Sequence, residues 1–296
     1  MRKREGYLIF AIILLLSMTV ISAGIFDFFK TGKASSAPQN VSVSVVGANA
    51  VIITVPPASG TPNEFGSRTI IFDVNVTDPD GVSDINTTSV RYEITKVAQT
   101  TKTGNCPYQN IVNSTTSNFT CTTVLWYYEA DGAWNIRVEG KDIGNTTLMN
   151  GTNTLTYGSL NAFLMSPSSI SWPGVTTGGA NQQANNDPTI INNTGNYVST
   201  ISIIGINLIG EAIQSEMIPA NNFTAGPSTG GAECSATPLV NGTSTAITGT
   251  NSNPGNLSAG GGAGQANIYY CIPSVPLVSS QIYSTNQGGS WTVSYT

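Results

Sequence analysis

The chain has 296 residues, of which only 9% are charged and none is histidine, and its formal net charge is −5. This length allows one large domain or two ordinary domains with substantial hydrophobic cores. This acidic composition provides no basic surface for a phosphate backbone, so we expect no nucleic-acid partner. Anionic membrane surfaces would also repel an acidic protein.

The N-terminus predicts export from the cytoplasm. Residues 2–4 are all basic, residues 7–23 carry no charge, and small residues precede Gly24. A basic region, an apolar run and a small-residue end are the parts of a secretory signal peptide. We therefore expect residues 1–23 to be a signal peptide or an anchor, and residues 24–38 to be a linker.

Two other interpretations of the N-terminal segment stay open. The apolar run could be retained as a membrane anchor, although it is a little shorter than the roughly 20 apolar residues that span a bilayer. Alternatively, removal of the basic stretch that ends at Gly6 would make this a pilin-like leader, and the apolar run would become an assembly helix. In either case the protein would contact the membrane only through this segment.

After the linker, apolar residues recur at every second position, which is the pattern of a half-buried β-strand. The alternation is clearest in residues 70–76, 90–94 and 134–138. Turn sequences, among them Pro79-Asp80-Gly81 and Asp131-Gly132, separate these runs. Short strands at this spacing predict a β-sandwich, and we expect no amphipathic helix after the leader.

A change in composition near Ser166 predicts a second module. Lys141 is the last basic residue, and the stretch 178–186 is polar and rich in glycine and asparagine. Three later runs are again strand-like: 198–208, 266–272 and 290–295. We therefore expect an all-β chain with two β-sandwich modules, which occupy residues 39–165 and 166–296.

Sequence motifs in both modules carry a family resemblance. The segments Val74–Asp84 (VNVTDPDGVSD) and Gly132–Asp142 (GAWNIRVEGKD) resemble the immunoglobulin-like repeats of archaeal and bacterial surface proteins. In those repeats one strand ends in a D-x-D-G turn, and a late strand reads W-x-(I/V)-x-V. The segment Asp187–Asn196 (DPTIINNTGN) is similar to a strand and turn of adhesion-related sandwich modules in prokaryotic exported proteins. The resemblance implies an immunoglobulin-like fold and a surface location, and it carries over no catalytic residue.

The four cysteines predict two disulfides. They form two local pairs along the chain, so in an exported protein we expect the bonds Cys106–Cys121 and Cys234–Cys271, although four cysteines allow three pairings. Metal binding by these cysteines is the alternative, but it needs closer cysteine spacing or histidine.

Eleven Asn-x-Ser/Thr sequons would accept N-linked glycans in a host that has the machinery. Soluble surfaces usually carry about 25–35% charged residues, so hydroxyls, amides and glycans must take over that role here. We therefore expect glycosylation at several of these sites. The sequon asparagines are Asn40, Asn75, Asn86, Asn113, Asn118, Asn145, Asn150, Asn192, Asn222, Asn241 and Asn256.

One cluster of carboxylates, which begins at Asp73, suggests a calcium site. Calcium takes six to eight oxygen ligands, and Asp78, Asp80 and Asp84 could supply three carboxylates from one turn, with Asp142 as a fourth. The alternative is a simple type I turn, in which an aspartate bonds its own backbone, proline presets φ and glycine closes the turn. No other cofactor is expected.

Three consecutive aromatic residues suggest a ligand surface. A strand through Trp126, Tyr127 and Tyr128 would place rings on both of its faces. On one interpretation Trp126 and Tyr128 form an exposed platform that stacks on sugar rings. On the other, Tyr127 merely covers a neighbouring strand or the predicted Cys121 disulfide.

The chain shows no catalytic constellation, because serine and cysteine nucleophiles usually need a base, most often histidine. We therefore predict a non-enzymatic protein of the cell surface or extracellular space with a structural or adhesive role. Its partners would be other surface proteins, glycans or further copies of itself. The alternatives are a carbohydrate-binding module of the cell envelope and a pilin-like filament subunit.

Overall fold

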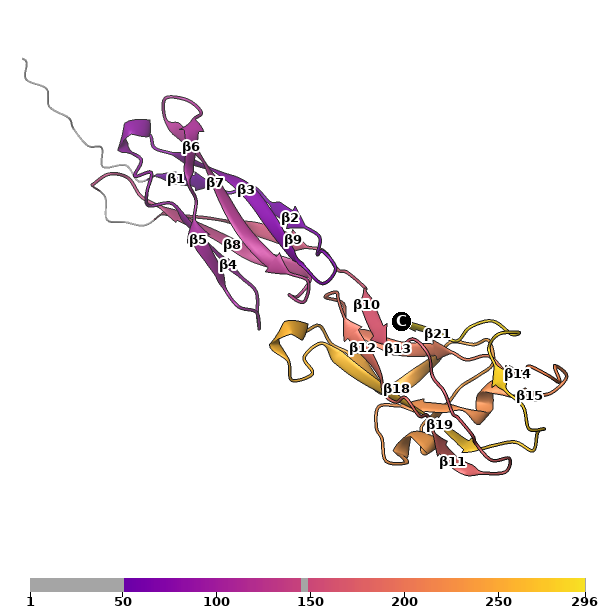
Figure 1. Cartoon of the computed structure of the whole chain (residues 1–296). Helices are drawn as coiled ribbons and strands as arrows, with labels where there is room; N and C mark the ends of the chain where they lie inside the picture. Colours follow the sequence, from indigo (N-terminus) through magenta and orange to yellow (C-terminus); the bar gives the residue numbers. More distant parts are fainter. Residues whose placement is uncertain (1–50, 145–148, 296) are drawn as a thin grey trace, which may run out of the picture. The chain divides into compact units, whose positions relative to one another are not determined.

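The computed structural model describes residues 51–144 and 149–295, and its regular elements are β-strands and short 3₁₀ turns (Figure 1). The prediction of an all-β chain is therefore confirmed. The predicted leader and linker, together with Asn40 and Asn145, lie outside the described residues. Within the described ranges no helix has the length and apolar character needed to cross a membrane.

The first nine strands of the described chain form two sheets. One has the strand order β1-β3-β7-β6 and the other the order β2-β9-β8-β4-β5. Neighbouring strands are antiparallel except β2 and β9, which are parallel. The strands are β1 (Ile52–Thr54), β2 (Ala58–Gly60), β3 (Ser67–Thr77), β4 (Arg91–Thr95), β5 (Lys102–Asn105), β6 (Tyr108–Ile111), β7 (Thr116–Trp126), β8 (Gly132–Gly140) and β9 (Met149–Tyr157).

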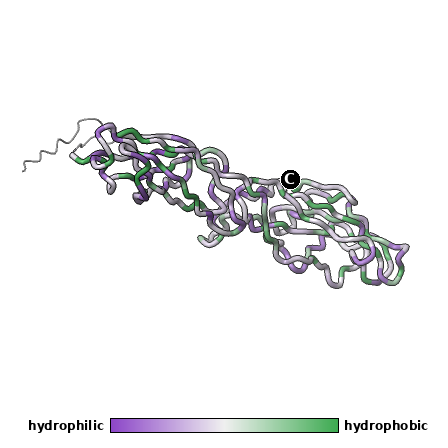
Figure 2. The backbone as a smooth tube through the Cα atoms, turned by 90° about the horizontal axis from the view of Figure 1, so that it is seen from above, coloured by the Kyte–Doolittle hydropathy of each residue, from purple (hydrophilic) through white to green (hydrophobic). Residues whose placement is uncertain are grey.

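Both of these sheets contribute to one hydrophobic core. Phe72 and Val74 from β3 and Trp134 and Ile136 from β8 are buried in it, as the period of two predicted, and polar residues alternate with them along the backbone (Figure 2). Burial of each such side chain contributes roughly 1.5–3 kcal/mol. We call the part of the chain around this core, residues 51–157, the first module.

Ion pairs join oppositely charged side chains of the first module. Arg91 and Glu139 lie opposite each other on β4 and β8 and form an ion pair of 2.9 Å, and Arg137 binds the same carboxylate. Lys102 pairs with Glu129, whose side chain is almost fully buried. The regular strands and paired charges agree with the amphipathic alternation of this half of the sequence.

The remaining strands are shorter on average, although β19 has ten residues, and they form three sheets. Their orders are β10-β12-β19-β16-β17 with β11 also paired to β19, then β18-β13-β21, and β15-β14-β20. The strands are β10 (Phe163–Ser166), β11 (Ala180–Gln183), β12 (Thr189–Asn193), β13 (Ser199–Ile204), β14 (Leu208–Gly210), β15 (Met217–Ile218), β16 (Thr224–Gly226), β17 (Thr237–Pro238), β18 (Thr245–Ser252), β19 (Gln265–Ser274), β20 (Tyr283–Ser284) and β21 (Thr292–Tyr295).

These shorter strands enclose a second hydrophobic core. Ile191, Ile203, Phe223 and Tyr270 are fully buried in it, whereas other large apolar side chains around it, including Trp291, are only half-buried. We call this part of the chain, residues 160–295, the second module. The predicted boundary at residue 165 falls within β10, which pairs with β12.

One predicted strand is broken in the second module. The apolar run 198–208 forms two strands, β13 and β14, separated at Gly205. Gly205 lies against Leu239, and a Cβ atom at this glycine would come within 3.1 Å of the Leu239 Cβ. The chain therefore leaves the sheet where a close approach to a neighbouring segment requires glycine.

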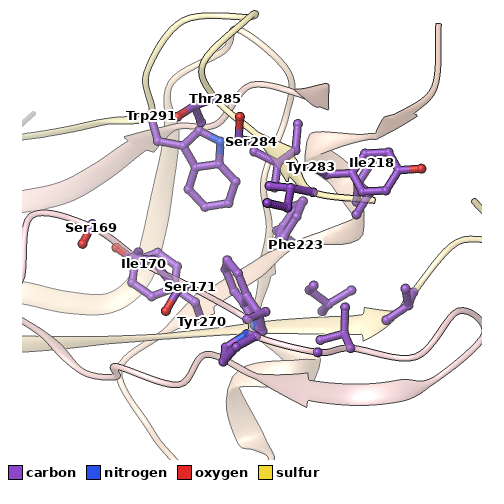
Figure 3. A pocket seen from close by; sticks show the side chains of 18 of the residues that line it. Ser169, Ile170, Ser171, Ile218, Phe223, Tyr270, Tyr283, Ser284, Thr285 and Trp291 are labelled. Carbon is purple, nitrogen blue, oxygen red and sulfur yellow. The ribbon is translucent and has the colours of Figure 1, made fainter. Parts of the chain in front are cut away.

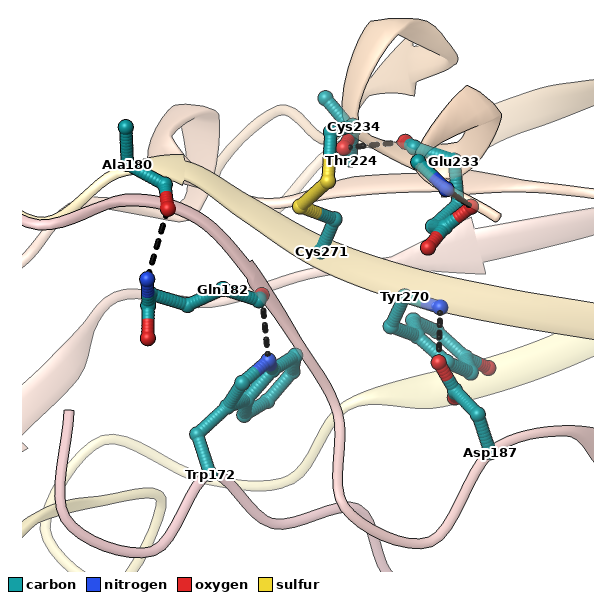
Figure 4. Close-up of a disulfide and its surroundings, with 10 residues drawn as sticks. Trp172, Ala180, Gln182, Asp187, Thr224, Glu233, Cys234, Tyr270 and Cys271 are labelled. Atoms are coloured by element: carbon teal, nitrogen blue, oxygen red, sulfur yellow. Dashed lines mark hydrogen bonds between the residues drawn. A yellow bond between two sulfur atoms is a disulfide. The ribbon is translucent and has the colours of Figure 1, made fainter. Parts of the chain in front are cut away.

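Each module contains one disulfide, and both have the predicted local pairing. Cys106, between β5 and β6, is bonded to Cys121 of β7. Cys234, in the 3₁₀ turn Ala232–Ser235, is bonded to Cys271 of β19 (Figure 4). Two disulfides suggest that the protein folds in an oxidising, extracellular environment.

Candidate metal centre

Three aspartates from separate segments meet in the first module. Asp78 follows β3, Asp84 ends the 3₁₀ turn Val82–Asp84, and Asp142 follows β8. One carboxylate oxygen from each residue lies within 4.8 Å of those of the other two. The three residues are buried, with exposed fractions of 0%, 8% and 1%.

Backbone hydrogen bonds position Asp78 in a tight turn. Its N–H donates to the Thr115 carbonyl at 2.8 Å, and its carbonyl accepts from the Gly81 N–H at 3.1 Å. The Asp80 N–H donates to Asp78 Oδ1 at 2.8 Å. Gly81 has φ of +120°, a conformation that favours glycine. The sequence offered such a turn as the alternative to a metal site, and the turn is present. Its hydrogen bond engages Asp78 Oδ1 and leaves Oδ2 without a partner.

The other two aspartates are held by pairing between their own segments. Ile85 and Asp142 form an isolated antiparallel bridge, and the Ile143 N–H donates to the Asp84 carbonyl at 2.6 Å. The N–H of Asp84 donates to the Gly81 carbonyl at 3.0 Å. These bonds fix the backbone on both sides of the cluster, so the carboxylates converge as a consequence of the fold.

The cluster is electrostatically unbalanced. Four of its oxygens are buried without a hydrogen-bond partner, namely Asp78 Oδ2, Asp84 Oδ2 and both carboxylate oxygens of Asp142. Burial raises the pKa of Asp78, and the charges of Asp84, Asp80 and Asp142 raise it further against the lowering effect of the Asp80 N–H. Buried polar groups are nearly always satisfied, so these four oxygens are exceptions to a general rule.

The sequence located two of the three clustered residues in its main prediction. Asp80 belongs to the same turn but is exposed and lies outside the cluster, and Asp73 accepts a hydrogen bond from Thr120 Oγ1 at 2.6 Å. Asp142, which the sequence offered only as a fourth ligand, completes the group. Chemically, three converging carboxylates offer the oxygen ligands that a hard cation such as calcium takes.

The predicted aromatic platform lies elsewhere in the first module. Trp126 is 44% exposed, Tyr128 is half-buried, and their rings are nearly parallel with centroids 6.3 Å apart. Tyr127, between them in sequence, points inward, is buried, and packs against Phe65 at 5.6 Å. The two outward rings therefore form a pair on one face of the strand end.

The second module contains a hollow of about 850 Å³. Figure 3 shows the rings of Phe223, Tyr270 and Trp291 around it, and none of its lining residues is charged. The indole N–H of Trp291 donates to the Ile206 carbonyl at 2.9 Å, and the Tyr283 hydroxyl donates to Glu216 at 2.6 Å. The lining therefore combines aromatic and aliphatic side chains with uncharged hydroxyl groups of serine and threonine.

Figure 4 also shows two further carboxylates of the second module, Asp187 next to Tyr270 and Glu233 next to Cys234 in sequence. Asp187 Oδ2 accepts from the Tyr270 N–H at 3.0 Å, while its Oδ1 is buried without a partner. Burial raises the pKa of Asp187 to about 6, against the lowering effect of the Tyr270 N–H, and the charge of Glu233 raises it further. Glu233 accepts from the Gly231 N–H at 3.0 Å, so it has a structural role in its 3₁₀ turn.

The sequon asparagines whose side chains the structure describes are all accessible to some degree. Asn75, Asn113 and Asn241 are exposed, and a further five are partly exposed: Asn86, Asn118, Asn192, Asn222 and Asn256. A glycan could therefore be attached to each of these asparagines without exposing a buried side chain.

No family model and no curated protein sequence matches this chain.

Proposed function

We propose that the protein is exported and has a non-catalytic structural or adhesive role at the cell surface or in the extracellular space. In this proposal residues 39–165 and 166–296 form two immunoglobulin-like β-sandwich modules. The observation that carries it is the presence of one local disulfide in each module, because such bonds form and persist mainly in oxidising compartments. The basic, apolar and small-residue parts of the N-terminal sequence support the same route.

An open sheet edge supports association with other surface proteins or with further copies of the chain. Strand β6 lies at the edge of its sheet, and all four of its residues are exposed. Tyr108 and Ile111 on this strand, and Val112 just after it, are large exposed apolar side chains. Exposed edge strands with apolar side chains pair readily with a strand of another chain.

The test is the N-terminus, intact mass and thiol content of the native protein from medium, envelope and filament fractions. We expect a start at Gly24, a mass above that of the polypeptide, and no free thiol before reduction. A start at Tyr7 in a filament fraction would replace this proposal with the pilin-like one. Four alkylated cysteines without reductant would contradict an extracellular location.

Carbohydrate binding is a second candidate, which the exposure of the stacked Trp126 and Tyr128 rings favours. An exposed aromatic ring can stack on the apolar face of a sugar. Affinity electrophoresis in envelope polysaccharides would test it. Retardation of the parent chain but not of Trp126→Ala would support binding, with Tyr108→Ala as the exposed aromatic control. Equal mobility of all three chains would exclude a role for this surface.

A further inference from the structure

We propose that Asp78, Asp84 and Asp142 bind one calcium ion, which fastens the turn after β3 to the segment after β8. The proposal concerns a site inside the first module and is independent of where the protein is located. It follows from the charge, the burial and the spacing of the three carboxylates.

The charge of the cluster requires compensation. Three carboxylates are buried, and among the described residues no ion pair involves any of them. Burying an unpaired carboxylate away from water is costly, and neighbouring carboxylates add repulsion. Hydrogen-bond donors do not supply the compensation, since four of the oxygens have no donor. A bound cation would satisfy these oxygens together.

The spacing of the oxygens fits a calcium ion. Two ligands on opposite sides of an ion lie twice the metal–oxygen distance apart, which is about 4.8 Å for calcium and about 4.2 Å for magnesium. The three oxygens lie within 4.8 Å of one another, so one ion can reach all three, and the choice of calcium over magnesium rests on the coordination that each ion demands. Magnesium also demands a near-ideal octahedron and retains its waters, which a buried set of carboxylates does not favour.

Carboxylate ligands argue against zinc, the common structural transition metal. Structural zinc prefers cysteine sulfur and histidine nitrogen. This chain has no histidine, and its four cysteines are in disulfides. Three carboxylates can provide between three and six oxygens, depending on how many bind through both atoms, and water or backbone carbonyls would complete the six to eight that calcium takes.

The ion would add to the few backbone contacts that already join the two segments. The two segments are joined by the Ile85–Asp142 bridge and by the Asn86 N–H, which donates to the Lys141 carbonyl at 3.0 Å. Without a cation, repulsion among the carboxylates opposes these bonds. With calcium bound, the same carboxylates would hold the segments together.

The test is calcium binding by the purified, disulfide-bonded chain after removal of metal with a chelator. Calorimetric titration should give one calcium per chain, and magnesium should bind at least tenfold more weakly. At a calcium concentration about 100 times Kd, the melting temperature of the first module should rise by about 5 °C or more. No calcium binding up to 10 mM, or equal affinity for magnesium, would overturn the proposal.

Matched variants locate the ion. Asp142→Asn and Asp84→Asn should each weaken calcium binding at least tenfold, whereas Asp80→Asn, in the same turn but outside the cluster, should change it less than threefold. The metal-free Asp142→Asn chain should be at least as stable as the metal-free parent, because it has lost a repelling charge. If Asp80→Asn weakens binding as much as Asp142→Asn, the proposed ligand set is wrong.

A measurement on the parent chain tests the proposal even if the variants fail to fold. Calcium should shift the backbone amide resonances of Gly81, Asp84 and Ile143 more than those of the second module. Shifts centred on the second module would place the ion elsewhere and contradict the proposal.

Discussion

The two modules of this chain stabilise their β-sheets in different ways. In the first, long strands such as β3 and β7 pair over eleven residues, and ion pairs join oppositely charged side chains. The second has shorter strands, a hollow lined by aromatic rings, and no basic residue at all. We infer that regular packing stabilises the first module, and that the second depends more on its disulfide and on hydrogen bonds between polar side chains and backbone.

Replacing one buried tryptophan in each module tests this difference most directly. Trp134 is fully buried, so Trp134→Ala should cost about 3–5 kcal/mol through lost contacts and a new cavity. Trp291 is half-buried at the edge of the hollow, and Trp291→Ala should cost about 1–2 kcal/mol. Calorimetric unfolding would measure both. Equal costs would mean that the second core is as tightly packed as the first.

Removing each disulfide tests the dependence of the second module on its cross-link. In the chain-entropy model the bonds close loops of 15 and 37 residues and contribute about 3 and 4 kcal/mol. We expect Cys234→Ser/Cys271→Ser to abolish cooperative unfolding of the second module. Cys106→Ser/Cys121→Ser should only lower the melting temperature of the first. The reverse order of damage would refute the comparison.

A buried charge in the first module gives an intermediate effect. Glu129 is almost completely buried and pairs with Lys102, so Lys102→Met should cost about 2–3 kcal/mol by leaving the carboxylate unpaired. Arg137 is about half exposed, and Arg137→Met should cost less than about 1 kcal/mol. Urea unfolding of the two variants would measure the difference, and similar costs would show that solvent screens Glu129.

Asp187 in the second module gives the smallest predicted effect. Its pKa is about 6 in the folded protein and about 4 in an unfolded chain, so the folded state retains a proton that the unfolded state has lost. Its contribution to stability is therefore complete below pH 4 and declines as the pH rises through 6. At pH 8 Asp187→Asn should be more stable than the parent by on the order of 1–2 kcal/mol.

The matched control for this pH dependence is Asp131→Asn, which replaces an exposed carboxylate of the first module. Thermal unfolding between pH 4 and pH 8 should show the decline in the second module of the parent and of the control, but not in Asp187→Asn. A decline of the same size in all three chains would assign it to other groups.

The sequence predicted the strands whose inward positions are aliphatic or aromatic and whose outward positions are charged or amide-bearing. Strands β3, β4 and β8 have this pattern, and each was located correctly. Strand β18, with the sequence TAITGTNS, was missed because buried threonine and serine look polar in a sequence. The hollow could not be predicted, because it depends on how short loops meet around the second core.

The sequence could also predict only part of the aspartate cluster. Asp78 and Asp84 are close together in the sequence, so the sequence could group them. Asp142 joins them only because β4 pairs with β8, with Arg91 opposite Glu139, which brings the segments just beyond this pairing side by side. Knowledge of that strand register, which sequence periodicity does not provide, would have been enough to prefer Asp142 over Asp80.

The local disulfides also set how far the chain could be stretched under mechanical load. A covalent loop cannot lengthen when its ends are pulled, and an extended residue spans at most about 3.3–3.6 Å. The Cys106–Cys121 and Cys234–Cys271 bonds, with separations of 15 and 37 residues, therefore withhold about 50 Å and about 130 Å of contour length. Pulled from its ends, the oxidised protein would be a shorter and stiffer tether than the reduced one, with more of the restriction in its second module.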